Sequence, residues 1–161
     1  MIEKDNHSLA MLHLDNAYQL HVNGKINEAI EAYKISIEYY PTARAHTYLG
    51  WAYSLKGKYE DAISECQIAI DLDPDFGNPY NDIGSYLISL NRYDEAIDWL
   101  EKAIYAEDYE PRHYPYYNLG MVYEKKGEWF TAMRYYNDAL EINPDYEMAQ
   151  SAVLRLTTLL N

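Results

Sequence analysis

Apolar side chains recur along this chain with the spacing of amphipathic helices. Residues 48–55 form one such stretch, with apolar side chains at Tyr48, Leu49, Ala52, Tyr53 and Leu55. A second stretch begins just after Gly57, with Tyr59, Ala62, Ile63, Cys66, Ala69 and Ile70 on one side. The three- and four-residue spacing predicts two helices, each with one apolar face and one polar face.

The pattern of a helix, a turn and a second helix occurs four times. Four segments align, and they begin at Gly24, Gly57, Asn91 and Gly127, which are 33, 34 and 36 residues apart. A small residue stands seven positions before each start, at Ala17, Gly50, Gly84 and Gly120. Another small residue follows each start, at Ser36, Ala69, Ala103 and Ala139. Proline then closes three of the four units, at Pro41, Pro74 and Pro144. Coordinated columns of this kind indicate an internal repeat.

Each column has a mechanical reason. Glycine or asparagine ends the first helix of a unit, because either residue adopts the left-handed conformation that a helix C-cap needs. Small residues such as Gly50 in the first helix and Ala62 in the second allow two antiparallel helices to approach closely. A proline such as Pro74 stops the second helix and redirects the chain.

These residues carry a resemblance to tetratricopeptide repeats, whose small, aromatic and proline positions recur with a 34-residue period. The resemblance covers about residues 10–146. It implies an all-α fold, a right-handed superhelical solenoid of four helix-turn-helix units followed by a C-terminal capping helix, with nine helices in total. The expected divisions are a frayed tail over 1–9, units over 10–42, 43–76, 77–112 and 113–146, and a cap over 147–161. Unit three departs from the pattern, since it lacks the closing proline and carries an insertion of about two residues within 106–115.

Composition and charge narrow the classes of function. Nineteen tyrosines against two phenylalanines favour many half-buried ring sites over a thick, dry core. A formal charge of -13 excludes a basic surface for nucleic acid and disfavours anionic membranes. No run approaches the roughly 20 apolar residues that span a bilayer, and the N-terminus has no apolar segment of signal-peptide type. We therefore expect a cytoplasmic protein without membrane insertion.

Candidate chemistry is sparse. Cys66 is the only cysteine, which excludes an internal disulfide, and its repeat column is a packing site between helices. The histidines show no metal-ligand spacing, and His13 and His46 occupy a packing column, whereas His21 is expected on the open face of its helix. Most carboxylates fall on second helices and are interpreted as a solvated face. Neither a catalytic site, nor a metal, nor a cofactor is predicted.

The resemblance also implies where a ligand is held, because in this family the first helices line the concave face. The groove residues inferred in this way are Tyr18, Arg44, Tyr48, Trp51, Asn81, Tyr114, Tyr117, Asn118 and Met121. The inward columns hold three acids and two bases, so a nearly neutral groove rich in aromatic anchors is expected. Some relatives clamp acidic peptide ends with lysine, arginine and asparagine, and the corresponding columns here cannot neutralise a carboxylate pair.

Two functions are compatible with this pattern. The first is a non-catalytic module or scaffold that binds a peptide or helix of a partner protein in the groove. The second is a structural protein that associates with itself, through its apolar last helix or through the groove. Some of the groove aromatics, Tyr48 first, can instead pack between neighbouring units. The sequence does not identify the partner.

Overall fold

The computed structural model describes residues 2–160 and the side chains from Asp5 onward. Within these residues the chain forms nine helices and no strand, which confirms the predicted fold class. The helices are α1 (Ile2–Val22), α2 (Ile26–Tyr39), α3 (Ala43–Ser54), α4 (Tyr59–Leu72), α5 (Asn78–Ser89), α6 (Tyr93–Tyr105), α7 (His113–Lys125), α8 (Trp129–Ile142) and α9 (Glu147–Leu160).

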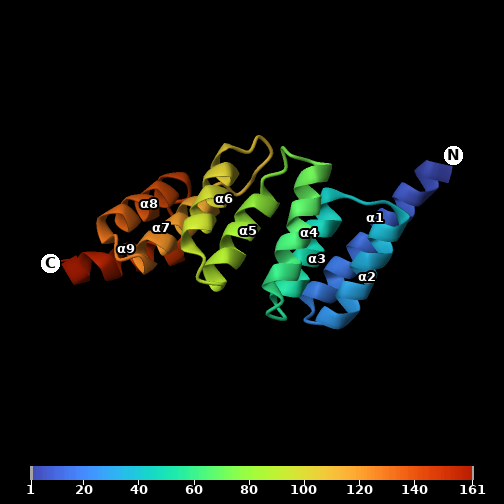
Figure 1. Ribbon diagram of the computed structural model, residues 1–161, viewed down its shortest axis with the longest axis horizontal. Helices are drawn as coiled ribbons and strands as arrows, with labels where there is room; N and C mark the ends of the chain where they lie inside the picture. The colour runs from blue at the N-terminus through green and yellow to red at the C-terminus, as the bar shows by residue number, and fades with distance from the viewer. Residues whose placement is uncertain (1, 161) are drawn as a thin grey trace.

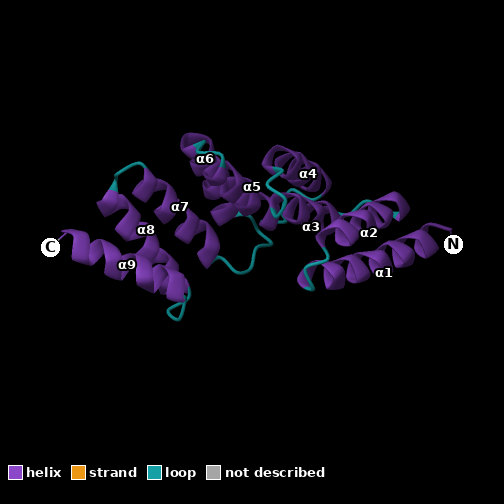
Figure 2. Cartoon of the chain, turned by 90° about the horizontal axis from the view of Figure 1, so that it is seen from below, coloured by secondary structure: helices purple, strands orange, loops and turns teal. Residues whose placement is uncertain are grey.

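The helices pack as successive antiparallel pairs along a curved array. The pairs are α1 with α2, α3 with α4, α5 with α6 and α7 with α8, and α9 packs on α8 (Figure 1). The first helices of neighbouring pairs also contact each other in turn, whereas the described second helices make no comparable contacts. The first helices therefore lie on the inner side of an arch, with α4 and α6 on its outer side (Figure 2).

The turn inside each pair has the predicted left-handed residue. Gly24, Gly57 and Gly127 have φ values of 78°, 71° and 78°, and Asn91 has a φ of 59°. The backbone N–H after each of these residues donates to a carbonyl five residues earlier, which satisfies a helix end that would otherwise be unpaired. Asparagine tolerates the conformation that glycine adopts in the other three units.

Close helix approach inside each pair follows from the small residues of the first helices. A Cβ atom added to Gly84 would lie 2.5 Å from the Leu100 side chain, and one added to Gly120 would lie 2.5 Å from the ring of Tyr136. A Cβ atom added to Gly50 would lie 2.9 Å from the Ala62 carbonyl oxygen. The facing side chains are fully buried, so the glycines set the spacing of the helix pairs.

The N-terminal segment is helical, whereas the sequence predicts a frayed tail over 1–9. Residues 2–9 continue α1 as regular helix, and Met1 lies outside the described residues. No proline or glycine interrupts this segment. The helix is also anchored by α2 and its end, because Ser36 donates to the Ala10 carbonyl at 2.7 Å and His7 packs edge-on against Tyr40. At the other end, α9 extends to Leu160 and Asn161 is not described.

The insertion of unit three forms a strap, residues 106–112, between α6 and α7. It lies beside the connection between α4 and α5, where Phe76 and Asp108 form a parallel β-bridge (Figure 1). Gly77 N donates to Asp108 O at 2.8 Å, and Asp108 N donates to Asp75 O at 3.0 Å. Tyr109 is 2% exposed and packs on Gly77, where an added Cβ would lie 2.3 Å from the Tyr109 Cβ.

An arginine holds the connection after α6, since the closing-proline column has Asp108 in this unit. The Arg112 guanidinium donates to the carbonyls of Ile104, Ala106 and Glu107 at 3.0 to 3.2 Å. These carbonyls lie at and just after the end of α6, where backbone acceptors lack helical partners. Arg112 thus fixes the start of the strap.

Replacing Gly84 by alanine is expected to lower stability by about 1–3 kcal/mol, because the new methyl group overpacks the contact with Leu100. Urea unfolding of Gly84→Ala, Leu100→Ala and the double variant measures this effect. The double variant should lose less than the sum of the single losses, since the smaller side chain makes room for the methyl group. Purely additive losses would contradict close approach at Gly84.

Cys66 should resist alkylation in the folded protein. It is 0% exposed in the core beneath Gly50, and burial raises the pKa of its thiol well above the ordinary value. Reaction with a thiol reagent should therefore track unfolding, and be fast only in denaturant. Rapid modification under native conditions would show that α3 and α4 separate readily.

Candidate functional site

An N-terminal aromatic cluster occupies the inner side of units one and two. Its members are Tyr18, His21, Tyr33, Tyr48 and Trp51. Tyr48 joins the two units, with ring centroids 5.6 Å from Tyr18 and 6.1 Å from Tyr33. Tyr18 and Trp51 are each 37% exposed, so the outer side of this cluster meets solvent.

His21 lies on the buried side of this cluster. The prediction that it lies on the open face of its helix is therefore wrong. The side chain is 3% exposed, with its ring 3.9 Å from that of Trp51 and Nδ1 hydrogen-bonded to the Tyr33 hydroxyl at 3.1 Å. Its Nε2 atom has no hydrogen-bond partner among the described residues, and burial lowers the pKa of the imidazole. Trp51 of the next unit covers the ring, which removes it from water.

A C-terminal aromatic cluster occupies the inner side of unit four. Its members are His113, Tyr114, Tyr117, Tyr136 and Tyr146. The Tyr146 ring lies 5.2 Å from Tyr117 and 5.7 Å from Tyr114, and burial raises its pKa to about 12. Tyr146 follows the last closing proline, where no repeat column singles it out, so the sequence pattern missed it.

Buried tyrosines support both clusters in the same way, through a hydrogen bond of the hydroxyl group. Tyr33 and Tyr136 occupy the same position of units one and four. The Tyr136 hydroxyl donates to Glu124 at 2.7 Å, just as the Tyr33 hydroxyl pairs with His21, which stands at the position equivalent to Glu124. Arg155 of α9 also donates to Glu124, at 2.7 Å. A hydrogen-bonded tyrosine therefore lies beneath each cluster, and the hydrogen bond limits the rotamers of that tyrosine.

Amides and a carboxylate lie between the two clusters. Asn118 of α7 donates to Asn81 Oδ1 of α5 at 2.9 Å, and Asn81 is only 8% exposed. Asn81 is thus engaged inside the protein, and Asn118 is partly exposed beside it. The adjacent Asp82 is partly buried, and burial raises the pKa of its carboxyl to about 7 despite a hydrogen bond from Asn81.

Cavities adjoin the groove at both ends. Near the N-terminal cluster, a cavity of about 250 Å³ lies between α1, α3 and the strap and is lined by Met11, Leu14, Arg44, Phe76 and Asp108, among others. Near the C-terminal cluster, a cavity of about 500 Å³ is lined by Tyr117, Met121, Glu124, Lys125, Trp129, Tyr136 and Arg155. Arg44 and Met121 therefore lie in separate cavities at opposite ends of the groove.

The nine residues that the resemblance places in the groove thus fall into four groups. Tyr18, Tyr48 and Trp51 share the first cluster, Tyr114 and Tyr117 share the second, and Asn81 and Asn118 form the bridge between them. Arg44 and Met121 line the cavities at the two ends. The sequence pattern missed Tyr146, Asp108 and Phe76, and it placed His21 on an open face although the side chain is buried.

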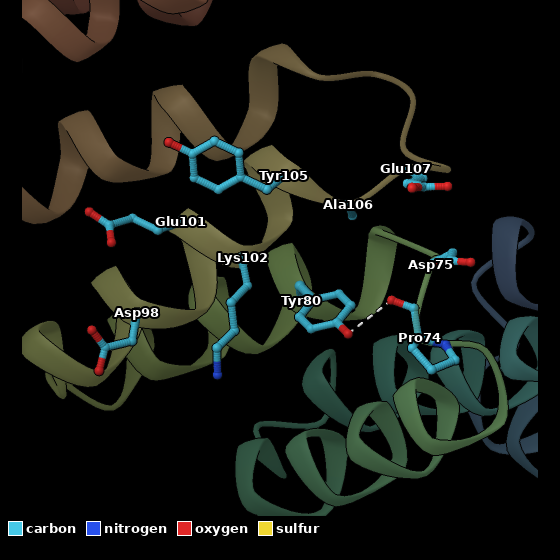
Figure 3. A pocket seen from close by; sticks show the side chains of 9 residues that line it. All are labelled: Pro74, Asp75, Tyr80, Asp98, Glu101, Lys102, Tyr105, Ala106 and Glu107. Atoms are coloured by element: carbon cyan, nitrogen blue, oxygen red, sulfur yellow. Dashed lines mark hydrogen bonds between the residues drawn. The ribbon is translucent and has the colours of Figure 1, made fainter.

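A larger cavity of about 710 Å³ lies away from the groove, on α6 and the connection before α5 (Figure 3). Its lining includes four carboxylates and Lys102, and the Tyr80 hydroxyl donates to the Pro74 carbonyl at 2.9 Å across one end. Lys102 stacks on Trp99 at 4.3 Å rather than pairing with an acid. The lining is an acidic, solvated face, as the charge pattern predicts.

The described residues limit other kinds of chemistry. No group of three or more histidine, cysteine, aspartate or glutamate side chains in residues 5–160 is arranged to hold a metal ion. No helix in the described part of the chain has the length and apolar content needed to cross a membrane. His46, placed by sequence in a packing column, is 7% exposed and pairs with Glu65 at 2.6 Å.

Comparison with solved structures supports the fold. PilF from Pseudomonas aeruginosa superposes with a TM-score of 0.88 at 21% identity, covering 94% of this chain and 69% of that chain. MamA superposes with a TM-score of 0.72 at 28% identity, covering 87% of this chain and 81% of that chain. The likeness to PilF concerns the fold alone.

Comparison with curated sequences covers shorter segments. The small glutamine-rich tetratricopeptide repeat-containing protein 2 of Mycosarcoma maydis is 35% identical over 77 residues, which is 47% of this chain and 22% of that protein. Three family models, each described as a tetratricopeptide repeat, match residues 14–75, 78–108 and 113–146. The chain therefore belongs to the tetratricopeptide repeat family.

Proposed function

We propose that the protein is a non-catalytic interaction module that holds a peptide or helix of a partner protein in its inner groove. Proteins of this family are in general scaffolds for interactions between proteins. The observation that carries the proposal is the pair of aromatic clusters, which present partly exposed rings at both ends of one surface. Rings held in place by buried partners offer large contact area at small entropic loss.

The chemistry of the groove indicates the kind of ligand. Apolar side chains of a partner would pack on Trp51 and Tyr117, and its backbone would find the Asn118 amide between them. Arg155 forms an ion pair with Glu124, and Arg44 lines the same cavity as the carboxylates of Asp73 and Asp108, so the inner surface offers little net charge. An extended peptide or a helix with two apolar anchors suits this arrangement.

Replacing both Trp51 and Tyr117 by alanine should weaken binding more than tenfold, since truncating such an anchor costs about 2 kcal/mol or more. The partner for the measurement is the protein recovered in a pull-down with the intact chain, titrated at low and high salt. Affinity should depend only weakly on salt, because the groove is nearly neutral.

The matched control is Tyr105→Ala with Phe130→Ala, which removes two rings that are 83% and 79% exposed on second helices. This control should bind like the unchanged protein, and all three proteins should keep their helical circular dichroism. A control that loses binding while Trp51→Ala/Tyr117→Ala keeps it would place the partner on the outer face.

Self-association through α9 is the second candidate, and exposed leucines favour it. Leu154 and Leu159 are 69% and 59% exposed on the side of α9 that no described helix covers. Light scattering coupled to gel filtration distinguishes the candidates. A dimer that Leu154→Glu/Leu159→Glu dissociates would support self-association, and a monomer would leave the groove as the binding surface.

A further inference from the structure

Asp82 occupies a central position in the groove. It lies on α5 between the N-terminal and C-terminal aromatic clusters, next to the Asn81–Asn118 hydrogen bond that joins α5 to α7. The equivalent position in unit four is Asn118, so a neutral amide of the same shape is compatible with the repeat. The carboxylate is therefore not required by helix packing.

No positive charge of the protein balances this carboxylate. The titratable groups near enough for the Asp82 charge to raise their pKa are Cys66 from α4, Tyr86 from α5 and Tyr109 from the strap, and none of them is cationic. On α3 and α7, the cations Arg44 and Lys125 line the cavities at the two ends of the groove. Asp82 makes no ion pair with any described side chain.

A partly desolvated carboxylate without a counter-charge is unfavourable in the free protein. Burial raises the pKa of this group to about 7, so near neutral pH it is ionised only in part. A lysine or arginine side chain brought by a ligand would supply the missing charge and favour the ionised form. Aromatic rings on both sides would hold the apolar residues of the same ligand.

We propose that Asp82 determines the specificity of the groove, selecting partner segments that place a lysine or arginine between two apolar anchors. This inference rests on the proposed function of the groove. It adds a charge requirement that the aromatic clusters alone do not impose. Asn118, which donates to Asn81, keeps the backbone of α7 beside the site, and Asp82 there keeps partial exposure to solvent.

The test begins with a random-peptide phage library panned against the intact protein at high salt, which suppresses general attraction to its net charge of -13. Selected peptides, and versions with glutamine in place of each lysine or arginine, are titrated against the unchanged protein. They are also titrated against Asp82→Asn, Trp51→Ala/Tyr117→Ala and Asp61→Asn. The last variant removes one exposed carboxylate from a second helix and matches the charge change.

The unchanged protein and Asp61→Asn should prefer the cationic peptide to its glutamine version by about tenfold, as expected for a charge-assisted hydrogen bond. Asp82→Asn should bind both versions alike. Affinity for the cationic peptide should also fall about tenfold from about pH 8 to about pH 6, because protonation of Asp82 removes the competent state. Asp82→Asn should lack this dependence on pH.

The two possible failures are distinguishable. The role of Asp82 would be overturned, and the groove left intact, by selected peptides that need Trp51 and Tyr117 but carry no cation. The same conclusion would follow if Asp82→Asn kept the preference for the cationic peptide over its glutamine version. Peptides that bind Trp51→Ala/Tyr117→Ala as tightly as the unchanged protein would overturn the groove and the role of Asp82 together.

Discussion

Backbone-to-side-chain contact inside each helix pair is the constraint on which the other features depend. At Gly84 and Gly120 the first helix has no room even for a Cβ atom, so the second helix lies directly against its backbone. The short distance between the two helices of each pair leaves the first helices near enough to contact one another along the array. Side chains on their free faces consequently share one inner surface, although they come from residues nearly a hundred positions apart, such as Tyr18 and Tyr117.

Constraints that recur in every unit could be predicted from sequence, and those that occur once could not. The glycine column and the left-handed Asn91 repeat with the period, so nine helices and their turns were foreseeable. The burial of His21 was not, because the equivalent positions hold Ser54, Ile88 and Glu124 and show no common property. The bridge formed by the strap was equally hidden, since an insertion has no second copy with which to align it.

The groove combines rigid ends with a polar middle, and both follow from burial. Tyr33 and Tyr136 lie in the core, and their hydroxyls form hydrogen bonds with the side chains of His21 and Glu124, so the partly exposed rings above them rest on an ordered support. Between them, the Asn81–Asn118 hydrogen bond fills the space that another ring would occupy. In the proposed function, affinity and selectivity are therefore separate: the ends would supply contact area, and the middle would discriminate among ligands by hydrogen bonding and charge.

The strap alters how the whole array can bend. A solenoid flexes through small rotations between neighbouring units, and an unbraced one distributes this motion along its length. Here the connections on either side of unit three are joined, through the Phe76–Asp108 bridge and the seating of Tyr109 on Gly77. The strap therefore restrains bending at the middle of the array. In the proposed function, adjustment to ligands of different width would therefore fall to the ends of the array, α1–α2 and α8–α9.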